Sequence, residues 1–283
     1  MRGPAARSPL TFIALTFGMS IGFWLIGAVT DRFSVELPGR LPISSLMASA
    51  PLLAAVVLIS KENNSGGVKR LLRRAFDCTS ITPKVWYAPA VLLMPGVMLV
   101  SYGVMRLLGQ PLPELEISLA AIPVVFVFFL AGAVCEELGW MGYAADPLRE
   151  RWSVPGTGLA LGVVWGVWHI IPYAQAGHAP AWIVWQCVYT IALRIIIVWL
   201  YDNTGKSVFA AILCHTSSNV GWFLFPNSGS HYNPAVTGII AALAVVCAVH
   251  RGGWRSGRRG RFTSFPGAGR PRPCYGRDAG LRG

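Results

Sequence analysis

Six polar side chains that could carry out chemistry lie in otherwise apolar stretches of the sequence, and they are Glu136, Glu137, His169, Arg194, His215 and Asn219. Carboxylates and imidazoles transfer protons, and amides donate hydrogen bonds, so together they could activate a water molecule and stabilise developing charge. An ionisable side chain inside a membrane costs at least about 2.5 kcal/mol on insertion scales. Such residues are functional candidates by default, and this set is the candidate site.

The spacing of these residues predicts how they face one another on helices. His215 and Asn219 are four residues apart and should line one helix face. The adjacent Glu136 and Glu137 should point about 100° apart, so one can face a cavity while the other orients a neighbour. At 1.5 Å per residue, the charged groups and histidines lie about 12–21 Å from the nearest cytoplasmic helix ends. They should therefore share one layer near the middle of the bilayer.

The elements that must position these residues are membrane-spanning helices. Of the 283 residues, 54% are hydrophobic and only 13% are charged, whereas a soluble domain carries about 25% charged residues. This composition excludes an ordinary soluble domain, a disordered chain and a disulfide framework. We predict an all-α polytopic bundle of about eight spans, at residues 10–30, 42–60, 86–108, 117–141, 156–173, 181–201, 207–225 and 234–250.

The distribution of lysine and arginine predicts the orientation of the bundle. Outside residues 251–283, eleven of these residues fall on the side of the N-terminus and three on the other side. By the positive-inside rule, both termini are expected in the cytoplasm. We expect residues 1–250 to form the bundle and residues 251–283, which hold nine arginines, to be a disordered basic cytoplasmic tail. Because most of the net charge of +12 lies in this tail, no nucleic-acid partner is expected.

Small residues predict one close helix–helix contact. Gly158, Gly162 and Gly166 recur every four residues and form a ridge without side chains. Another helix can approach such a ridge closely. His169 lies three residues after Gly166, and it should therefore stand beside this contact.

Three motifs in residues 117–225 resemble those of the CAAX-protease and bacteriocin-processing family of intramembrane proteases (CPBP, or Abi). The family pattern is Glu-Glu-x-x-x-Arg, then Phe-x-x-x-His, then His-x-x-x-Asn. Here the first motif is Glu136-Glu137-Leu138-Gly139-Trp140-Met141. The second runs from Trp165, in place of Phe, to His169, and the third from His215 to Asn219.

The resemblance implies hydrolysis of peptide bonds inside the membrane, at a cavity open to the cytosol. Glu136 would activate a water molecule that His169 also holds. His215 and Asn219 would donate hydrogen bonds to the oxyanion of the tetrahedral intermediate. Glu137 would orient or partner these groups. The substrate would be a membrane-associated peptide, such as a prenylated peptide, a bacteriocin leader or a segment of a membrane protein.

One position departs from the family motif, because Met141 stands where the family has arginine. That arginine would help to keep the glutamates charged. We hypothesise that Arg194, at similar depth in another helix, supplies the missing positive charge, with Trp165 as a further supporting residue. The alternative is that Arg194 extends to the cytoplasmic interface.

Whether a metal takes part is open at the level of the sequence. His169, His215 and Glu136 would match the His₂Glu count of catalytic zinc sites. The His-Glu-x-x-His arrangement of soluble zinc proteases is absent. We favour a glutamate-activated water without metal, with zinc as the alternative.

Three other classes of function remain as alternatives. A non-catalytic membrane partner, such as a bacteriocin-immunity or scaffold protein, would keep the fold without needing Glu136. A transporter would also place polar groups at mid-membrane, but no repeated halves are visible. A cysteine protease would need Cys135 or Cys214 to be activated, and both lie in apolar helices. Twenty arginines against four lysines suggest a GC-rich bacterial genome, and hence a multi-pass protein of the bacterial plasma membrane.

Overall fold

The computed structural model describes residues 7–30, 33, 36–37, 41–62, 66–114, 121–226 and 229–250. The predicted disorder of residues 251–283 and the predicted start of the fourth span at 117 lie outside these residues. The larger helices are α1 (Pro9–Thr30), α2 (Ala50–Lys61), α4 (Tyr87–Leu107), α5 (Ala121–Gly139), α7 (Val154–Gln175), α8 (Pro180–Asn203), α9 (Val208–Phe223) and α10 (Pro234–His250). The short helices are η2 (Ile43–Ser49), α3 (Gly67–Arg73), η3 (Arg74–Phe76), η4 (Cys78–Ser80), η5 (Lys84–Trp86), η6 (Trp140–Ala144) and α6 (Ala145–Arg149). Two strands of two residues each, β1 (Glu36–Leu37) and β2 (Leu41–Pro42), pair antiparallel.

The prediction of an all-α polytopic bundle is confirmed, since each of the eight predicted segments is mainly helical where it is described. Six helical stretches of the described chain are long and apolar enough to cross a membrane. They are Pro9–Thr30, Ile43–Lys61, Lys84–Leu107, Ile122–Arg149, Val154–Gln175 and Pro180–Asn203. The last two predicted spans form shorter helices, α9 with 16 residues and α10 with 17.

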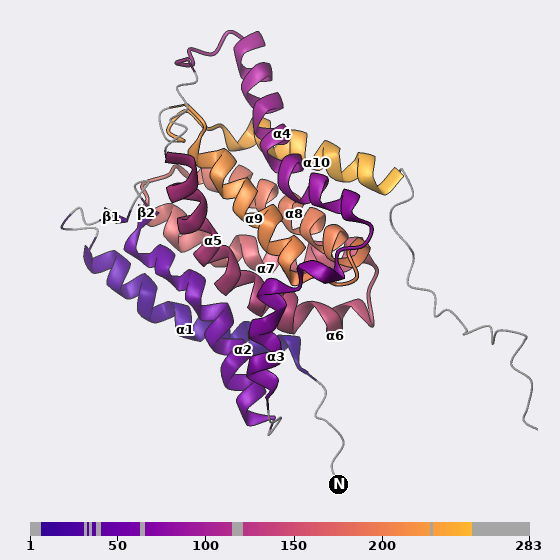
Figure 1. The fold of residues 1–283 in the computed structure, drawn as a ribbon. Coiled ribbons are helices and arrows are strands. Elements are labelled where there is room, and N and C mark those ends of the chain that lie inside the picture. Colours follow the sequence, from indigo (N-terminus) through magenta and orange to yellow (C-terminus); the bar gives the residue numbers. More distant parts are fainter. Residues whose placement is uncertain are drawn as a thin grey trace, which may run out of the picture.

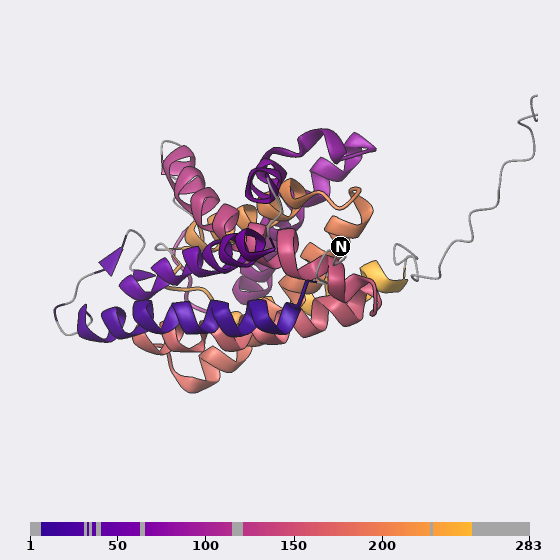
Figure 2. The same cartoon turned by 90° about the horizontal axis from the view of Figure 1, so that it is seen from below.

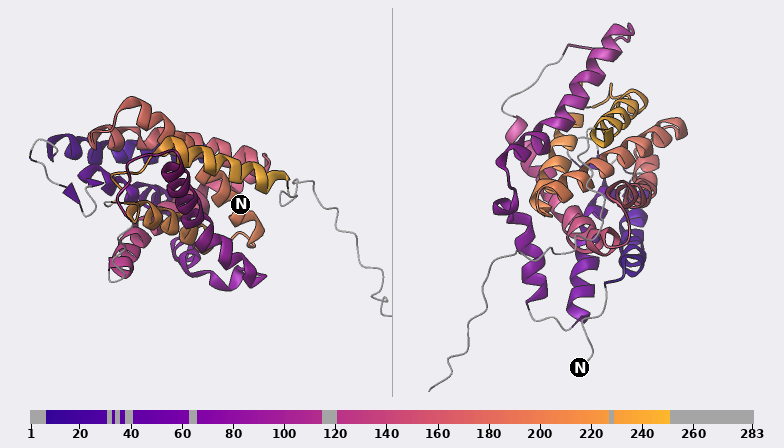
Figure 3. Two further views of the ribbon diagram at one scale, coloured as in Figure 1. Left: turned by 90° about the horizontal axis from the view of Figure 1, so that it is seen from above. Right: turned by 90° about the vertical axis from the view of Figure 1, so that its right-hand side faces the viewer.

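Helices α7, α8 and α9 form the centre of the bundle, with α1 and α2 on one flank and α10 on the other (Figure 1). Helix α1 runs along its flank for nearly the length of the bundle (Figure 2). The C-terminal end of α4 projects beyond the neighbouring helices (Figures 1 and 3). This arrangement leaves α5, α7, α8 and α9 as the helices that surround the candidate site.

The predicted glycine ridge of α7 packs directly against the backbone of α8. A Cβ atom on Gly158 would lie 2.7 Å from the Cα of Ile195, and one on Gly162 would lie 3.0 Å from the Cα of Ile191. The first distance is too short for any Cβ atom and the second is at the limit of a tight contact, so glycine permits this close approach. The close contact brings Arg194 of α8 against α7, because a Cβ on Gly162 would also lie 3.3 Å from the Cβ of Arg194.

The helix that carries the two glutamates does not end where the sequence predicts. Helix α5 continues through the π-helical segment η6 into α6 and ends at Arg149, not at residue 141. Single π-turns inside helices occur frequently at functional sites. Here the π-turn contains Met141, whose side chain is completely buried in the apolar core.

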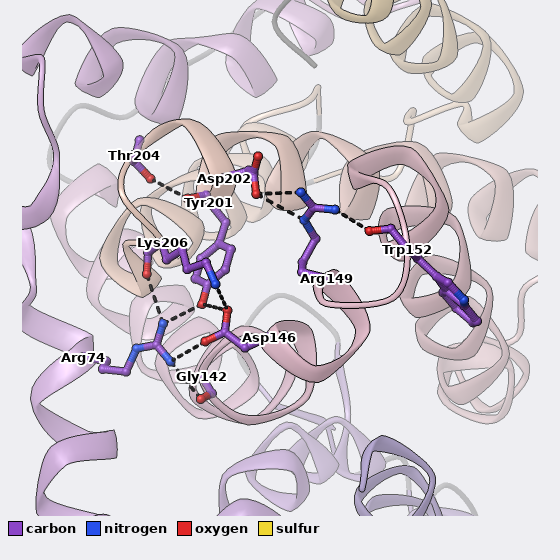
Figure 4. Close-up of polar contacts among 9 residues, drawn as sticks. All are labelled: Arg74, Gly142, Asp146, Arg149, Trp152, Tyr201, Asp202, Thr204 and Lys206. Carbon is purple, nitrogen blue, oxygen red and sulfur yellow. Dashed lines mark hydrogen bonds and ion pairs between the residues drawn. The ribbon is translucent and has the colours of Figure 1, made fainter. Parts of the chain in front are cut away.

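Polar side chains join the helix ends at one end of the bundle, which we call the basic end (Figure 4). Asp146 of α6 accepts hydrogen bonds from the Lys206 Nζ at 2.9 Å and the Tyr201 hydroxyl at 3.0 Å. Arg74 donates to the Tyr201 hydroxyl at 2.6 Å and to the carbonyl oxygen of Gly142 at 2.9 Å. These bonds hold η3, η6 and the C-terminal end of α8 together.

Different contacts define the opposite end of the bundle, formed by residues 41–49, 173–182 and 229–232. The amide of Gln175 donates to the carbonyl oxygen of Trp24 at 2.8 Å. The hydroxyl of Tyr232 donates to Oε1 of Gln186 at 3.0 Å. Because each long helix runs between the two ends, every residue of the candidate site can be placed relative to them.

Candidate active site

Glu137 is enclosed between two helices that approach α5 from different sides. Its Oε2 atom accepts a hydrogen bond from Nη1 of Arg194 in α8 at 2.6 Å, and this forms a salt bridge. Its Oε1 atom lies 2.9 Å from Nδ1 of His215 in α9. Both side chains of the ion pair are 0% exposed. With each carboxylate oxygen occupied, Glu137 serves as a fixed anion that positions its neighbours.

The structure places Arg194 beside Glu137, where the hypothesis of a substitute positive charge requires it, and its buried side chain does not extend to the interface. The Arg194 guanidinium lies over the indole ring of Trp165, 3.9 Å from its centroid. Nε and Nη2 of Arg194 are buried and have no hydrogen-bond partner among the described residues. A cation–π contact and one carboxylate therefore hold this buried charge.

Glu136 faces away from this ion pair, as expected for a residue about 100° further around the helix. Its side chain is buried, with 6% exposed, yet it contributes to the wall of a cavity. The indole Nε1 of Trp165 donates a hydrogen bond to its Oε2 atom at 2.7 Å. Trp165 thus contacts both halves of the site, with its ring plane against Arg194 and its N–H on Glu136.

His169 stands one turn along α7 from Trp165 and lines the same cavity as Glu136. Its Nδ1 atom lies 2.8 Å from the carbonyl oxygen of Trp165. Because a carbonyl can only accept, Nδ1 carries the proton, and the Nε2 atom of the neutral ring has a free lone pair. The ring stacks on Tyr173, with centroids 5.5 Å apart.

The cavity has a volume of about 860 Å³ and reaches from the end formed by residues 41–49, 173–182 and 229–232 down to Glu136. Of the predicted site residues, it is lined by Glu136, His169 and Asn219. His215 is not part of the lining and is buried behind it, against Glu137. The wall is mainly apolar, with Met47, Val127, Phe128, Phe129, Trp182 and Trp222.

The position of the cavity opening shows that two expectations from the sequence conflict with each other. All lining residues lie in the half of the bundle away from Arg74, Asp146 and Lys206 of the basic end. A cavity open to the cytosol and a cytoplasmic basic end therefore cannot both be correct. The composition of the chain does not indicate a pocket's direction, and only the packing of the helices places its opening.

Several polar residues of the cavity were not identified from the sequence. The hydroxyl groups of Tyr189 and Ser218 lie 2.6 Å apart, and both residues line the cavity with Gln186 and Tyr173. Ser218 lies three residues after His215, so helical spacing alone could have placed it beside the site. Tyr189 and Gln186 carry no such signal, because an uncharged polar residue in a span is common.

The three residues considered as zinc ligands do not form a ligand set. Within the described ranges, no three His, Cys, Asp or Glu side chains are arranged to hold a metal ion. Glu136, His169 and His215 are therefore not grouped as a His₂Glu site in the part of the chain that the structure describes.

At the cavity mouth, His178 stacks on Trp182 with ring centroids 3.6 Å apart. Partial burial lowers the pKa of His178 below its ordinary value, so the ring is neutral at pH 7. The mouth thus has an aromatic, uncharged rim on this side.

Comparison with known proteins gives two matches. Residues 118–221 match the family model described as type II CAAX prenyl endopeptidase Rce1-like. A protein of Methanococcus maripaludis named CAAX prenyl protease 2 is 29% identical over 230 residues, which cover 75% of this chain and 83% of the relative. The family match includes all three motifs and the helices that form the site.

Proposed function

Because residues 118–221 match the Rce1-like CAAX prenyl endopeptidase family model, we propose that the chain is an intramembrane protease in which Glu136 activates the hydrolytic water in the cavity. The observation that carries this proposal is the different environment of the two glutamates. Glu137 is bound by Arg194 and His215, whereas Glu136 has only the Trp165 N–H and faces the cavity. Glu136 is therefore the carboxylate that is free to accept a proton.

A water molecule beside Glu136 and His169 would have two acceptors for its two hydrogens. One hydrogen bond would go to the Glu136 carboxylate and the other to the free Nε2 lone pair of His169. The lone pair of the water oxygen is then directed at the substrate carbonyl carbon. Glu136 takes the proton as the C–O bond forms and returns it to the nitrogen of the amine as the C–N bond breaks.

The oxyanion formed in this step needs hydrogen-bond donors within the cavity. The amide NH₂ of Asn219, which lines the cavity, is a donor in any protonation state. His215 already directs Nδ1 to Glu137, so it can donate from Nε2 only as an imidazolium. We therefore assign the main donor role to Asn219, and we assign His215 to holding the negative charge of Glu137 in place. Each oxyanion donor typically contributes about 3–4 kcal/mol.

The apolar cavity wall supports a substrate that carries an apolar anchor. The relative is named as a prenyl protease, and a prenyl chain would remove apolar surface from water against residues such as Phe128, Phe129 and Trp222. We propose that the substrate is a lipidated or otherwise membrane-anchored peptide, cleaved in a cell membrane.

A cleavage assay with a fluorogenic farnesylated peptide, performed in detergent, tests this function. We expect wild type to cleave the peptide and Glu136→Gln to lose at least a thousandfold in kcat while it elutes and unfolds like wild type. Glu62→Gln is the matched control, because Glu62 lies outside the cavity and contacts Tyr143 near the basic end. It should retain wild-type activity.

Two results would overturn the proposal. Activity that survives in Glu136→Gln would show that another group activates the water. Activity that survives there but is lost in Cys135→Ser would identify thiol chemistry, since Cys135 lines the same cavity. A wild-type protein inactive on every anchored peptide tested would instead favour the non-catalytic membrane partner.

A further inference from the structure

One part of the mainly apolar cavity wall carries a pair of hydroxyl groups from two helices. Tyr189 of α8 and Ser218 of α9 both line the cavity, and their hydroxyl oxygen atoms lie 2.6 Å apart. The two residues are 4% and 2% exposed, respectively. A buried hydroxyl group costs free energy unless it forms hydrogen bonds. Each of the two hydroxyl protons therefore needs an acceptor.

Only one of these two protons can lie between the two oxygen atoms. A phenol is a stronger hydrogen-bond donor than an aliphatic alcohol, so Tyr189 donates and the Ser218 oxygen accepts. Ser20 and Ser101, which are also buried in spans, donate to the carbonyl oxygen one turn earlier, at 2.8 and 2.7 Å. Ser218 makes no such bond within the part of the chain that the structure describes. Its proton is therefore available to a substrate atom in the cavity.

The position of the Tyr189 hydroxyl is fixed by the packing around its ring. The ring lies edge-on to that of Tyr232, with centroids 6.2 Å apart, and Tyr232 donates in turn to Gln186 at 3.0 Å. Helix α10 packs against the same turn of α8, because a Cβ on Gly238 would lie 3.5 Å from the backbone nitrogen of Tyr189. A donor that is held in place before the substrate binds does not have to reorganise during the reaction.

The Ser218 hydroxyl also lies next to the main oxyanion donor. Ser218 directly precedes Asn219 in α9, and both residues line the cavity. One turn earlier, the ring of His215 lies 5.1 Å from that of Trp165, whose N–H binds Glu136. An oxyanion bound by Asn219 alone would have one neutral donor, whereas Ser218 supplies a second one without any charge on His215.

We infer that Ser218 is a catalytic residue whose hydroxyl donates a hydrogen bond to the oxyanion beside the Asn219 amide, and that Tyr189 is its positioning residue. By donating to the Ser218 oxygen, Tyr189 orients the serine hydroxyl and polarises its O–H bond. No covalent bond forms or breaks at either residue. This inference rests on the proposed function and adds two residues to the groups that stabilise its transition state.

Kinetics of folded variants in detergent test the role of the Ser218 hydroxyl. Ser218→Ala should lower kcat for the farnesylated fluorogenic peptide by about a hundredfold and change KM by less than about threefold, because the oxyanion exists only in the transition state and the intermediate. Ser217→Ala is the matched control, because Ser217 is also buried in α9 but does not line the described cavity. It should keep the wild-type kcat. A Ser218→Ala protein with the wild-type kcat overturns the inference.

A double-mutant cycle tests whether Tyr189 acts through Ser218. Tyr189→Phe removes one hydroxyl and should lower kcat by about tenfold, but it should cause no further loss when Ser218 is already alanine. Tyr201→Phe is the control in the same helix, since that hydroxyl bonds to Arg74 and Asp146 at the basic end. It should leave kcat unchanged.

A pair that only joins α8 to α9 would give a different result in this cycle. The variants would then have lower melting temperatures, but each folded protein would keep the wild-type kcat. That result overturns the inference, and so do independent, multiplicative effects of the two substitutions on kcat.

Two inhibitors show whether Ser218 contacts the reacting oxygen atom. The first is a farnesylated peptide with a phosphonamidate at the scissile bond, which resembles the tetrahedral intermediate. The second has a CH₂ group in place of the scissile carbonyl, and so it has no oxygen atom for Ser218 to bind. Ser218→Ala should weaken the phosphonamidate by the factor by which kcat/KM falls, and the second inhibitor by less than about threefold. Equal weakening of both inhibitors overturns the inference.

A second variant and the Glu136 variant complete the test. If Ser218→Ala does not elute as a folded species, Ser218→Cys replaces it, because a thiol is close in size but is a weak donor. Its kcat should fall by at least about tenfold, and the wild-type kcat in this variant overturns the inference. An inactive wild type overturns the proposed function itself. If Glu136→Gln is inactive while both Ser218 variants are as active as wild type, only the role of Ser218 is overturned.

Discussion

At the scale of single residues, Glu136 and Glu137 show how two identical neighbours acquire different chemistry. Both are buried, but Glu137 binds Arg194 and His215 while Glu136 faces the cavity with one indole donor. The rotation of about 100° between adjacent helical residues is sufficient to separate them. One is thereby fixed as a charge, and the other remains available as a base.

The ion pair between Arg194 and Glu137 should be strongly coupled. Arg194→Met leaves the Glu137 carboxylate buried without its cation, and we expect it to lower the free energy of unfolding by about 3–5 kcal/mol. The double variant Arg194→Met/Glu137→Gln should recover much of this loss, as measured by denaturation in detergent. Lys206→Met is the contrasting variant, because its half-exposed pair with Asp146 should contribute at most about 1 kcal/mol. Additive effects of the two site substitutions would contradict the coupling.

The N–H group of Trp165 should support catalysis separately from its ring. Trp165→Phe removes the hydrogen bond to Glu136 and keeps an aromatic face under Arg194. A hydrogen bond to a charged group contributes about 1.5–3 kcal/mol, so we expect kcat to fall by about ten- to a hundredfold. Because Trp165 is buried, the smaller ring should also lower the melting temperature, so kcat is measured below the unfolding transition. Unchanged kcat in the folded variant would exclude a role for the indole N–H.

Among single residues, the sequence identified the ionisable members of the candidate site. Glu136, Glu137, His169 and His215 stand out because ionisable groups in apolar helices are costly. The residue that could replace the missing motif arginine was also foreseeable, since Arg194 is the arginine that lies near the middle of a predicted span. Tyr189 was not, because its place in the site depends on a 2.6 Å contact with Ser218 of another helix, which no spacing along one helix predicts.

At the scale of secondary-structure elements, the contact between α7 and α8 sets the position of the site. The glycine ridge lets α8 approach until Arg194 lies over Trp165. The four-residue repeat predicted this contact, but the π-turn after Glu137 was not predicted. A π-turn has no sequence pattern of its own, and it is stabilised here by packing, with Trp140, Met141 and Tyr143 all buried.

Alanine substitutions along the ridge should have graded effects. A Cβ on Gly158 would lie 2.7 Å from backbone, whereas a Cβ on Gly166 would lie 3.5 Å from its nearest neighbour. We expect Gly158→Ala to destabilise by about 1–3 kcal/mol through overpacking, and Gly166→Ala to be tolerated. Gly22→Ala in α1, where nothing lies within 4 Å, is the control for helix propensity. Equal melting temperatures for all three variants would contradict close α7–α8 packing.

At the scale of the whole molecule, the bundle is closed at one end and hollow at the other. Asp146 accepts bonds from Tyr201 and Lys206 and lies 3.9 Å from Arg74, so it joins three segments at the closed end. The basic residues give a prediction of the orientation of the chain, but nothing in the sequence predicts the side of the cavity. That side depends on which half of each helix packs tightly.

Removal of Asp146 should weaken the closed end without affecting the chemistry. For Asp146→Ala we expect a loss of about 1–2 kcal/mol in unfolding free energy, discounted for its partial exposure. The value of kcat at low temperature should equal that of wild type, because Asp146 lies outside the cavity. A fall in kcat with unchanged stability would contradict this purely structural role.

The depth of the cavity, which reaches Glu136, also affects where the voltage across a membrane falls within the protein. Water in the cavity would conduct, so most of a transmembrane voltage would drop across the tightly packed half between Glu136 and the basic end. Moving one elementary charge through that drop is worth about 2.3 kcal/mol per 100 mV. The tight packing around Leu138, Met141 and Tyr201 would consequently serve as the electrical insulation of the protein.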